Sequence, residues 1–85
     1  MNESEKHYNA GVDFQGLWRL QEAIQDYDEA IRLNPQYARA YTNRARTYAG
    51  LGKYTEAKRD VDQAVELGFD RSELDSDIEG LKRER

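Results

Sequence analysis

The 85-residue sequence contains no cysteine, a single proline and no long run of apolar residues. The absence of cysteine excludes disulfide bonds and thiolate metal sites. A membrane-spanning helix needs about 18 or more consecutive apolar residues, so we expect no membrane span. The N-terminal residues lack the apolar core of a signal peptide. We therefore expect a cytoplasmic protein without a membrane partner.

The sequence also has fewer basic than acidic residues, 13 against 17, so the net charge is −4. An acidic chain is not attracted as a whole to nucleic acid or to an anionic membrane. Three arginines, Arg39, Arg44 and Arg46, are nevertheless the only charges between Pro35 and Lys53. Interleaved tyrosines would let such a stripe bind nucleic acid. Because those tyrosines fall on a packing stripe and the flanking segments are acidic, we expect no nucleic-acid partner.

An internal repeat of 34 residues is the main positive feature of the sequence. Residues 4–37 align without a gap on residues 38–71, with nine identical positions. The identical pairs are Asn9/Asn43, Gly16/Gly50, Leu17/Leu51, Glu22/Glu56, Ala23/Ala57, Asp26/Asp60, Asp28/Asp62, Ala30/Ala64 and Leu33/Leu67. The chain therefore contains two copies of one structural unit.

Each copy has the periodicity of two helices, since its apolar residues recur at spacings of three and four. Asn34-Pro35 separates the copies, and Gly52-Lys53 interrupts the second copy. Small residues at matched positions, Gly11/Ala45 and Ala23/Ala57, predict close approach of paired helices. With a charged C-terminal segment added, the pattern predicts five helices, over 4–17, 20–33, 38–51, 54–67 and 72–83.

These two units resemble the tetratricopeptide repeat. The second unit carries the resemblance through Tyr41-Thr42-Asn43-Arg44-Ala45, Tyr48, Gly52-Lys53-Tyr54, Glu56-Ala57, Asp60 and Ala64-Val65. The first carries it through Tyr8-Asn9-Ala10-Gly11, Phe14, Ala23-Ile24, Asp26-Tyr27, Ala30-Ile31 and Leu33-Asn34-Pro35. The resemblance implies one all-α domain over 1–85, a superhelix of stacked hairpins. Its parts would be repeat 1 (4–37), repeat 2 (38–71) and a capping helix (72–85).

The C-terminal segment fits a helix that covers the last apolar face of such a stack. Ser72 followed by Asp75 resembles a capping box. Leu74, Ile78 and Leu81 form a narrow apolar stripe at helical spacing.

Trp18 departs from the family pattern because it stands where the second repeat has Gly52. A turn of this kind uses a left-handed backbone that is inexpensive only for glycine. Either Gly16 takes over the helix-ending role, or burial of the Trp18 ring compensates for the strain. We expect at least half of the ring to be covered, within the chain or by a partner.

Candidate catalytic and metal-binding residues are few. His7, the single histidine, falls on an apolar stripe, and no nucleophile or glycine-rich loop accompanies it. Residues two apart on a helix point about 200° apart, so the aspartate pairs of the two repeats cannot form one ligand face. We expect these aspartates, Asp26/Asp28 and Asp60/Asp62, to lie on a solvated outer face. Asp26 and Asp60 should lie near Arg44 or other basic residues. We therefore expect no enzyme, metal or cofactor.

The first helix of each repeat lines the concave surface in this family, so the resemblance implies that these helices bind a protein or peptide. The candidate groove residues are Tyr8, Asn9, Val12, Arg39, Thr42, Asn43 and Arg46. Arg39 and Arg46 would attract an acidic partner or a carboxylate, Asn43 would hold its backbone, and Tyr8 and Val12 would form an apolar shelf. Two alternatives remain: the asparagines only bridge helices, or the arginines pair with Glu5, Glu73 or Asp77.

One subset of the family clamps the C-terminal carboxylate of heat-shock chaperones with basic and asparagine residues from three repeats. Asn43 fits the middle asparagine, but Tyr8 and Val12 do not fit the first-repeat positions. The resemblance therefore does not extend to chaperone binding. Because about three repeats are usually needed for an independent core, self-association as a homo-oligomer, or membership of a longer array, is the alternative function.

Overall fold

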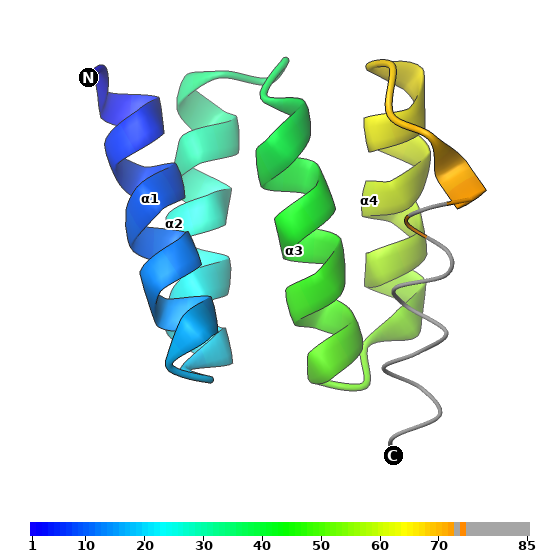
Figure 1. Cartoon of the computed structure of the whole chain (residues 1–85), viewed down its shortest axis with the longest axis horizontal. Coiled ribbons are helices and arrows are strands. Elements are labelled where there is room, and N and C mark those ends of the chain that lie inside the picture. Colours follow the sequence, from blue (N-terminus) through cyan, green and yellow to red (C-terminus); the bar gives the residue numbers. More distant parts are fainter. Residues whose placement is uncertain (73, 75–85) are drawn as a thin grey trace.

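The computed structural model describes residues 1–72 and 74 and arranges four helices as two hairpins (Figure 1). The helices are α1 (Glu3–Gly16), α2 (Leu20–Leu33), α3 (Ala38–Gly50) and α4 (Tyr54–Glu66). Each differs from its predicted bounds by no more than one residue at either end. The described part of the chain contains no strand. The all-α hairpin fold is thus confirmed, while the predicted helix over 72–83 falls almost wholly outside the described residues.

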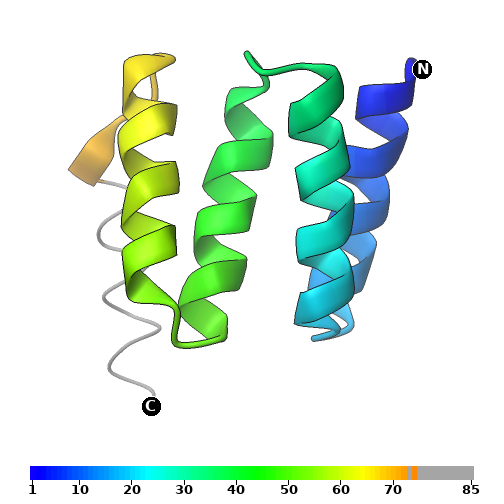
Figure 2. The same ribbon diagram turned by 180° about the vertical axis from the view of Figure 1, so that it is seen from behind.

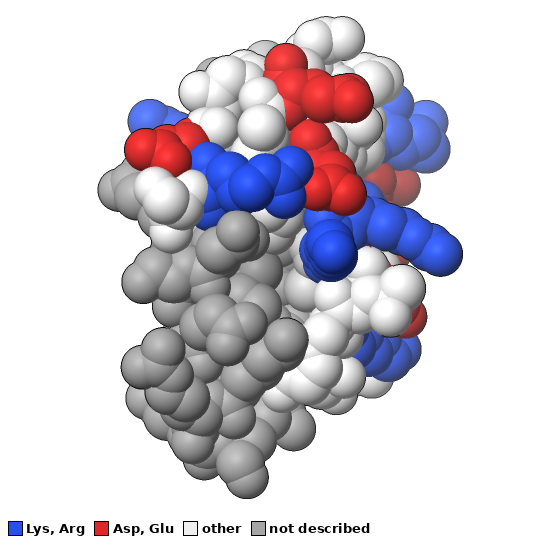
Figure 3. All heavy atoms as spheres, turned by 90° about the vertical axis from the view of Figure 1, so that its right-hand side faces the viewer, with Lys and Arg blue, Asp and Glu red and all other residues white. Residues whose placement is uncertain are grey.

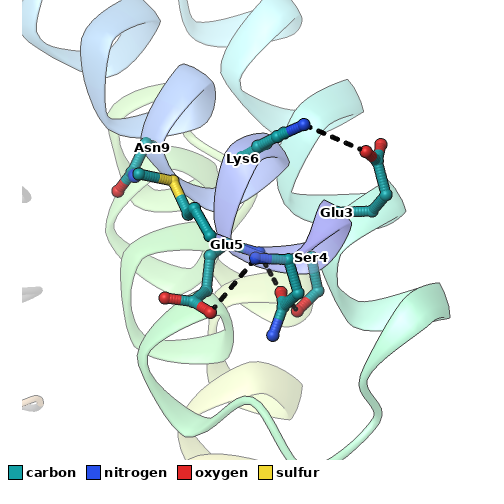
Figure 4. A network of polar contacts seen from close by, with 7 residues as sticks. Glu3, Ser4, Glu5, Lys6 and Asn9 are labelled. Carbon is teal, nitrogen blue, oxygen red and sulfur yellow. Dashed lines mark hydrogen bonds and ion pairs between the residues drawn. The ribbon is translucent and has the colours of Figure 1, made fainter.

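The N-terminal end of α1 is fixed by a capping box (Figure 4). The Asn2 side chain accepts a hydrogen bond from the Glu5 backbone N–H at 2.9 Å, and the Glu5 carboxylate accepts one from the Asn2 backbone N–H. The Ser4 hydroxyl also donates to Asn2 Oδ1, at 3.0 Å. Glu5 is therefore used locally to start the helix.

Three helices end in the same way, with one residue in the left-handed region. The residues are Trp18, Gly52 and Gly68, with φ values of 60°, 77° and 110°. In each case the next backbone N–H returns to a carbonyl in the last helical turn: Arg19 to Phe14 at 2.9 Å, Lys53 to Tyr48 at 2.8 Å and Phe69 to Ala64 at 3.1 Å. These bonds define a Schellman ending at all three junctions.

Trp18 therefore adopts the strained conformation itself, and Gly16 does not replace it. The Trp18 side chain reaches toward Gly50, where an added Cβ would lie 3.5 Å from Trp18 Cη2. The residue still remains 65% exposed. Of the two expected ways to cover the ring, coverage within the described part of the chain is not observed, because Trp18 lies at the end of a hairpin. Coverage by a partner stays a prediction.

The core between the helices is built largely from alanine, which lets the helix axes approach closely. Ala23 and Ala57 are both fully buried, as their matched positions predicted. The other buried apolar residues are Leu20, Ile24, Tyr27, Ala30, Ala40, Ala45, Ala49, Val61, Ala64 and Leu74. Partly buried tyrosines complete the packing around the second hairpin.

The hairpins stack so that α2 packs against α3 and α1 also contacts α3. Figure 1 shows α1 in front of α2, and the reverse view shows α2 in front of α1 (Figure 2). Among the four described helices, α2 and α4 make no contact with each other. The first helices of the two repeats therefore lie side by side, and we call their shared surface the α1–α3 face.

Residues after α4 begin a new helical turn at residue 71. Asp70 caps this turn, since its carboxylate accepts from the Ser72 backbone N–H at 2.9 Å and from the Ser72 hydroxyl at 2.7 Å. These two hydrogen bonds lower the pKa of Asp70. The predicted capping role of Ser72 thus belongs to Asp70, because the turn starts one residue earlier. Within residues 1–72 and 74, no helix has both the length and the apolarity to cross a bilayer.

Candidate functional site

The α1–α3 face contains a chain of hydrogen bonds that joins the two repeats. Asn43 Nδ2 on α3 donates to the Tyr8 hydroxyl on α1 at 2.9 Å. Asn43 Oδ1 accepts from an Arg46 guanidinium N–H at 2.8 Å. Asn43 therefore bridges α1 and α3, as expected in the alternative in which the asparagines link helices.

This chain leaves hydrogen-bond donors available on two residues. The Tyr8 oxygen accepts from Asn43, so its own O–H points elsewhere. The Asn43 carbonyl oxygen accepts from Arg46, whereas the amide nitrogen has a second N–H. Tyr8 and Asn43 thus present donors that suit acceptors such as carboxylates and backbone carbonyls.

Tyrosine rings flank this polar chain. Tyr8 stacks on Tyr37 with ring centroids 5.0 Å apart and an interplanar angle of 27°. Tyr8 also lies against Tyr27, at 6.0 Å. Burial, followed by the neighbouring Tyr8, raises the pKa of Tyr27 and of Tyr37. These hydroxyls are therefore protonated near neutral pH, and the face keeps its donor character.

Arg39 stands at the edge of a shallow cavity of about 480 Å³ between the start of α1 and the start of α3. Asn2, Ser4, Glu5, Asn34, Gln36, Tyr37, Ala38 and Phe69 also line this cavity. Arg39 is exposed, and within residues 1–72 and 74 it forms no ion pair. Pairing with Glu5, one of the alternatives from the sequence, is therefore not observed, because Glu5 closes the capping box. Glu73 and Asp77 lie outside the described residues.

The two remaining α1 candidates occupy the edge of the face. Asn9 is exposed, and its Nδ2 lies 3.0 Å from the thioether sulfur of Met1 (Figure 4). Val12 is 40% exposed. Asn9 therefore does not repeat, among the described residues, the hydrogen bonds that Asn43 forms with Tyr8 and Arg46.

Thr42 does not belong with these residues, although it was a candidate for the groove. It is only 3% exposed, and its hydroxyl donates to the Arg39 carbonyl oxygen at 2.9 Å. The reason is that α3 packs against α1, α2 and α4, so more of its circumference is buried than for α1. Thr42 therefore offers no group to a ligand.

Polar contacts away from this face correct two further expectations. His7, expected to pack as an apolar residue, places Nδ1 3.0 Å from Asp26 Oδ1 and links α1 to α2. Asp60, expected on a solvated surface, is only 4% exposed. It receives two hydrogen bonds from Arg44, at 2.8 and 2.7 Å. The expected proximity of Asp60 to Arg44 is thus confirmed, whereas the expected exposure of Asp60 is wrong.

Arg44 joins three helices on the side remote from Tyr8. Besides Asp60 on α4, it donates to Asp28 on α2 at 2.8 Å, and its guanidinium lies over the rings of Tyr41 and Tyr48. Burial lowers the pKa of Arg44, but the hydrogen bonds to Asp60 and Asp28 outweigh it, so the net shift is upward. Arg44 is thus a structural cation, whereas Arg39 is the exposed arginine of α3.

Charges on the α4 side of the molecule have mixed sign (Figure 3). Lys58 and Arg59 line a separate cavity of about 360 Å³ together with Tyr54, Thr55 and Asp62. Asp62 forms an ion pair with Arg71 at 2.8 Å. Since acid and base alternate here, this surface provides a comparison for the α1–α3 face. In the part of the chain that the structure describes, no group of three or more His, Cys, Asp or Glu residues is placed to hold a metal ion.

Comparison with known proteins gives two overlapping matches to family models. A model described as "TPR repeat" matches residues 19–52, and one described as "Tetratricopeptide repeat" matches residues 38–68. Together they span residues 19–68, more than half of the chain.

Three curated proteins illustrate the similarity. The chain is 50% identical over 46 residues to the Hsp70-Hsp90 organizing protein of Triticum aestivum, covering 54% of this chain and 8% of that protein. It is 38% identical over 64 residues to Hsp70-Hsp90 organizing protein 3 of Arabidopsis thaliana, covering 75% of this chain and 12% of that protein. It is 32% identical over 79 residues to the DnaJ homolog subfamily C member 7 homolog of Dictyostelium discoideum, covering 93% of this chain and 15% of that protein. The chain thus spans only a small fraction of the length of these relatives.

Proposed function

The chain belongs to the tetratricopeptide repeat family, and from this premise we propose that its α1–α3 face binds an acidic segment of another protein. Protein–protein interaction is the general role that the family and the relatives support. The observation that supports the finer proposal is the pair of donors on Tyr8 and Asn43 beside the exposed Arg39. A carboxylate-bearing chain supplies acceptors for these donors and a charge opposite to that of Arg39.

The names of two relatives mention Hsp70 and Hsp90, but we do not extend those partners to this chain. Tyr8 and Val12 stand where the chaperone-binding subset of the family needs a basic residue and an asparagine. The matched segments are also small parts of much longer proteins. The proposal therefore names the chemistry of the partner, an acidic segment, and not its identity.

Charge reversal on α3 tests the proposal. The variant Arg39→Glu/Arg46→Glu should lose binding to acidic peptide pools, and wild-type binding should weaken as salt is raised, because exposed charges are screened. Lys58→Glu/Arg59→Glu makes the same change in charge on the α4 side and should keep binding. Circular dichroism of both variants checks that the fold survives. If wild-type protein shows no preference for acidic over basic peptides, or if the α3 variant retains it, the proposal fails.

Self-association is a second candidate, favoured by apolar exposure at the turn between α1 and α2. Leu17 and Trp18 in this turn are 66% and 65% exposed. A non-glycine residue in the left-handed region costs on the order of 1 kcal/mol, yet the chain keeps a tryptophan there. A large aromatic side chain is a common anchor of protein interfaces. This turn would pair two copies through Leu17 and Trp18.

A further inference from the structure

Resting on the proposed function, the cavity at the start of α1 and α3 points to a more specific ligand, and we infer that it selects a segment in which a basic residue accompanies the acidic one. The acidic residue contacts Arg39, and the basic residue contacts Glu5. Both side chains line the same cavity of about 480 Å³, Glu5 from α1 and Arg39 from α3. Glu5 is thereby assigned as a residue that determines which acidic segments bind.

The cavity presents one charge of each sign. Of the described residues that line it, only Glu5 and Arg39 are charged. Both are exposed, and neither forms an ion pair within residues 1–72 and 74. A ligand with both charges is therefore attracted at each wall of the cavity, whereas a purely acidic ligand is attracted by Arg39 and repelled by Glu5.

The hydroxyl of Tyr37, which also lines the cavity, shows that both charges act at one place. Burial raises the pKa of Tyr37, and Tyr8 and Glu5 raise it further, whereas Arg39 lowers it. A carboxylate and a guanidinium from two different helices therefore both lie within electrostatic reach of this hydroxyl. The two charges thus face a shared space, and one short segment can contact both.

The capping box explains why Glu5 and Arg39 do not neutralise each other. The Glu5 carboxylate accepts from the Asn2 backbone N–H at 3.5 Å, and the Glu5 backbone N–H donates to the Asn2 side chain at 2.9 Å. An ionised carboxylate has about four acceptor sites, so this contact leaves sites for a basic residue of a ligand. Glu5 thus holds a negative charge at the cavity wall while it starts α1.

A peptide series tests the inference with the full chain. The probes are acetylated and amidated serine–alanine peptides with one glutamate and, two positions before or after it, either lysine or glutamine. Calorimetry at low salt should show that lysine strengthens binding about two- to fivefold in at least one of the two orders, the gain from one exposed charge contact. Glu5→Gln should abolish this gain, and it keeps the fold because glutamine also completes a capping box.

Glu3→Gln is the matched control, since Glu3 carries the same charge in the same first turn of α1 but does not line the cavity. Its carboxylate pairs with Lys6 at 3.3 Å, and Figure 4 shows this pair pointing away from Glu5. This variant should keep the gain from lysine. Circular dichroism checks that both variants are folded.

The outcomes separate the inference from the proposed function. Binding that lysine does not strengthen, but that Arg39→Gln weakens, would overturn the inference and leave the acidic-segment proposal standing. A gain from lysine that survives Glu5→Gln, or that Glu3→Gln also abolishes, would mean that the net charge of the protein attracts lysine, which contradicts the inference as well. Absence of binding by every glutamate peptide, or binding that Arg39→Gln leaves unchanged, would overturn both.

Discussion

Gly11 and Tyr27 show how single residues set the distance between helices. A Cβ added to Gly11 would lie 2.6 Å from Tyr27 Cε1 and 2.7 Å from Cδ1, closer than atoms in contact allow. Tyr27 is fully buried, and its hydroxyl donates to Gln15 Oε1 at 2.5 Å, so the ring has little freedom to move. The second repeat has Ala45 and Val61 at the equivalent positions, 34 residues on. The two repeats thus fill the same space with different residue pairs.

Gly11→Ala should therefore destabilise the protein, although alanine normally favours a helix by about 1 kcal/mol. Overpacking of a tight core site costs about 1–3 kcal/mol. Gly16→Ala is the matched control, because Gly16 also lies in α1 but has no atom within 4 Å of the added Cβ. Thermal and urea unfolding should show a lower melting temperature and a lower free energy of unfolding for Gly11→Ala. Neither quantity should fall for Gly16→Ala. Equal stability of the two variants would mean that Tyr27 can move.

At the scale of elements, the repeat alignment predicted the helices because both copies share their turn and core positions. It could not predict how many neighbours surround each helix. Thr42 and Asp60 were therefore assigned to open surfaces, yet the packing of α3 against three helices, and of α4 against α3, buries them. Trp18 was recognised as an anomaly from its sequence position, but only the structure shows that its backbone follows the glycine pattern.

The ion pair between Arg44 on α3 and Asp60 on α4 gives a prediction at the scale of elements. Asp60→Asn removes the charge that pairs with Arg44, whose side chain is only 18% exposed. The loss should be about 1–3 kcal/mol, the cost of leaving buried donors unsatisfied, because Asp28 still pairs with Arg44. Asp62→Asn breaks the exposed pair with Arg71 and should cost at most about 1 kcal/mol. Urea unfolding of both variants at pH 7 measures the difference, and similar losses would contradict the assignment of Arg44 as a structural cation.

For the whole molecule, the single tryptophan reports on the turn between α1 and α2. The exposure of Trp18 predicts that a dilute solution emits at the long wavelength of indole in water. If two copies pair through this turn, emission should shift to shorter wavelength as concentration rises, together with an increase in sedimentation mass. Trp18→Asn, which tolerates the left-handed backbone, should then stay monomeric. An emission maximum and a sedimentation mass that stay constant over the concentration series would contradict self-association through Trp18.

The central claim, binding of an acidic segment on the α1–α3 face, is tested most directly by nuclear magnetic resonance. An acetylated and amidated acidic peptide is titrated into ¹⁵N-labelled protein at low salt, and the side-chain amide signals of Asn43 are followed with the backbone signals. The account predicts saturable shifts of the Asn43 side chain and of the amides of Arg39 and Arg46, reversed by added salt, with Lys58 and Arg59 unmoved. Shifts confined to α4, or an unchanged Asn43 side chain at saturating peptide, would contradict it.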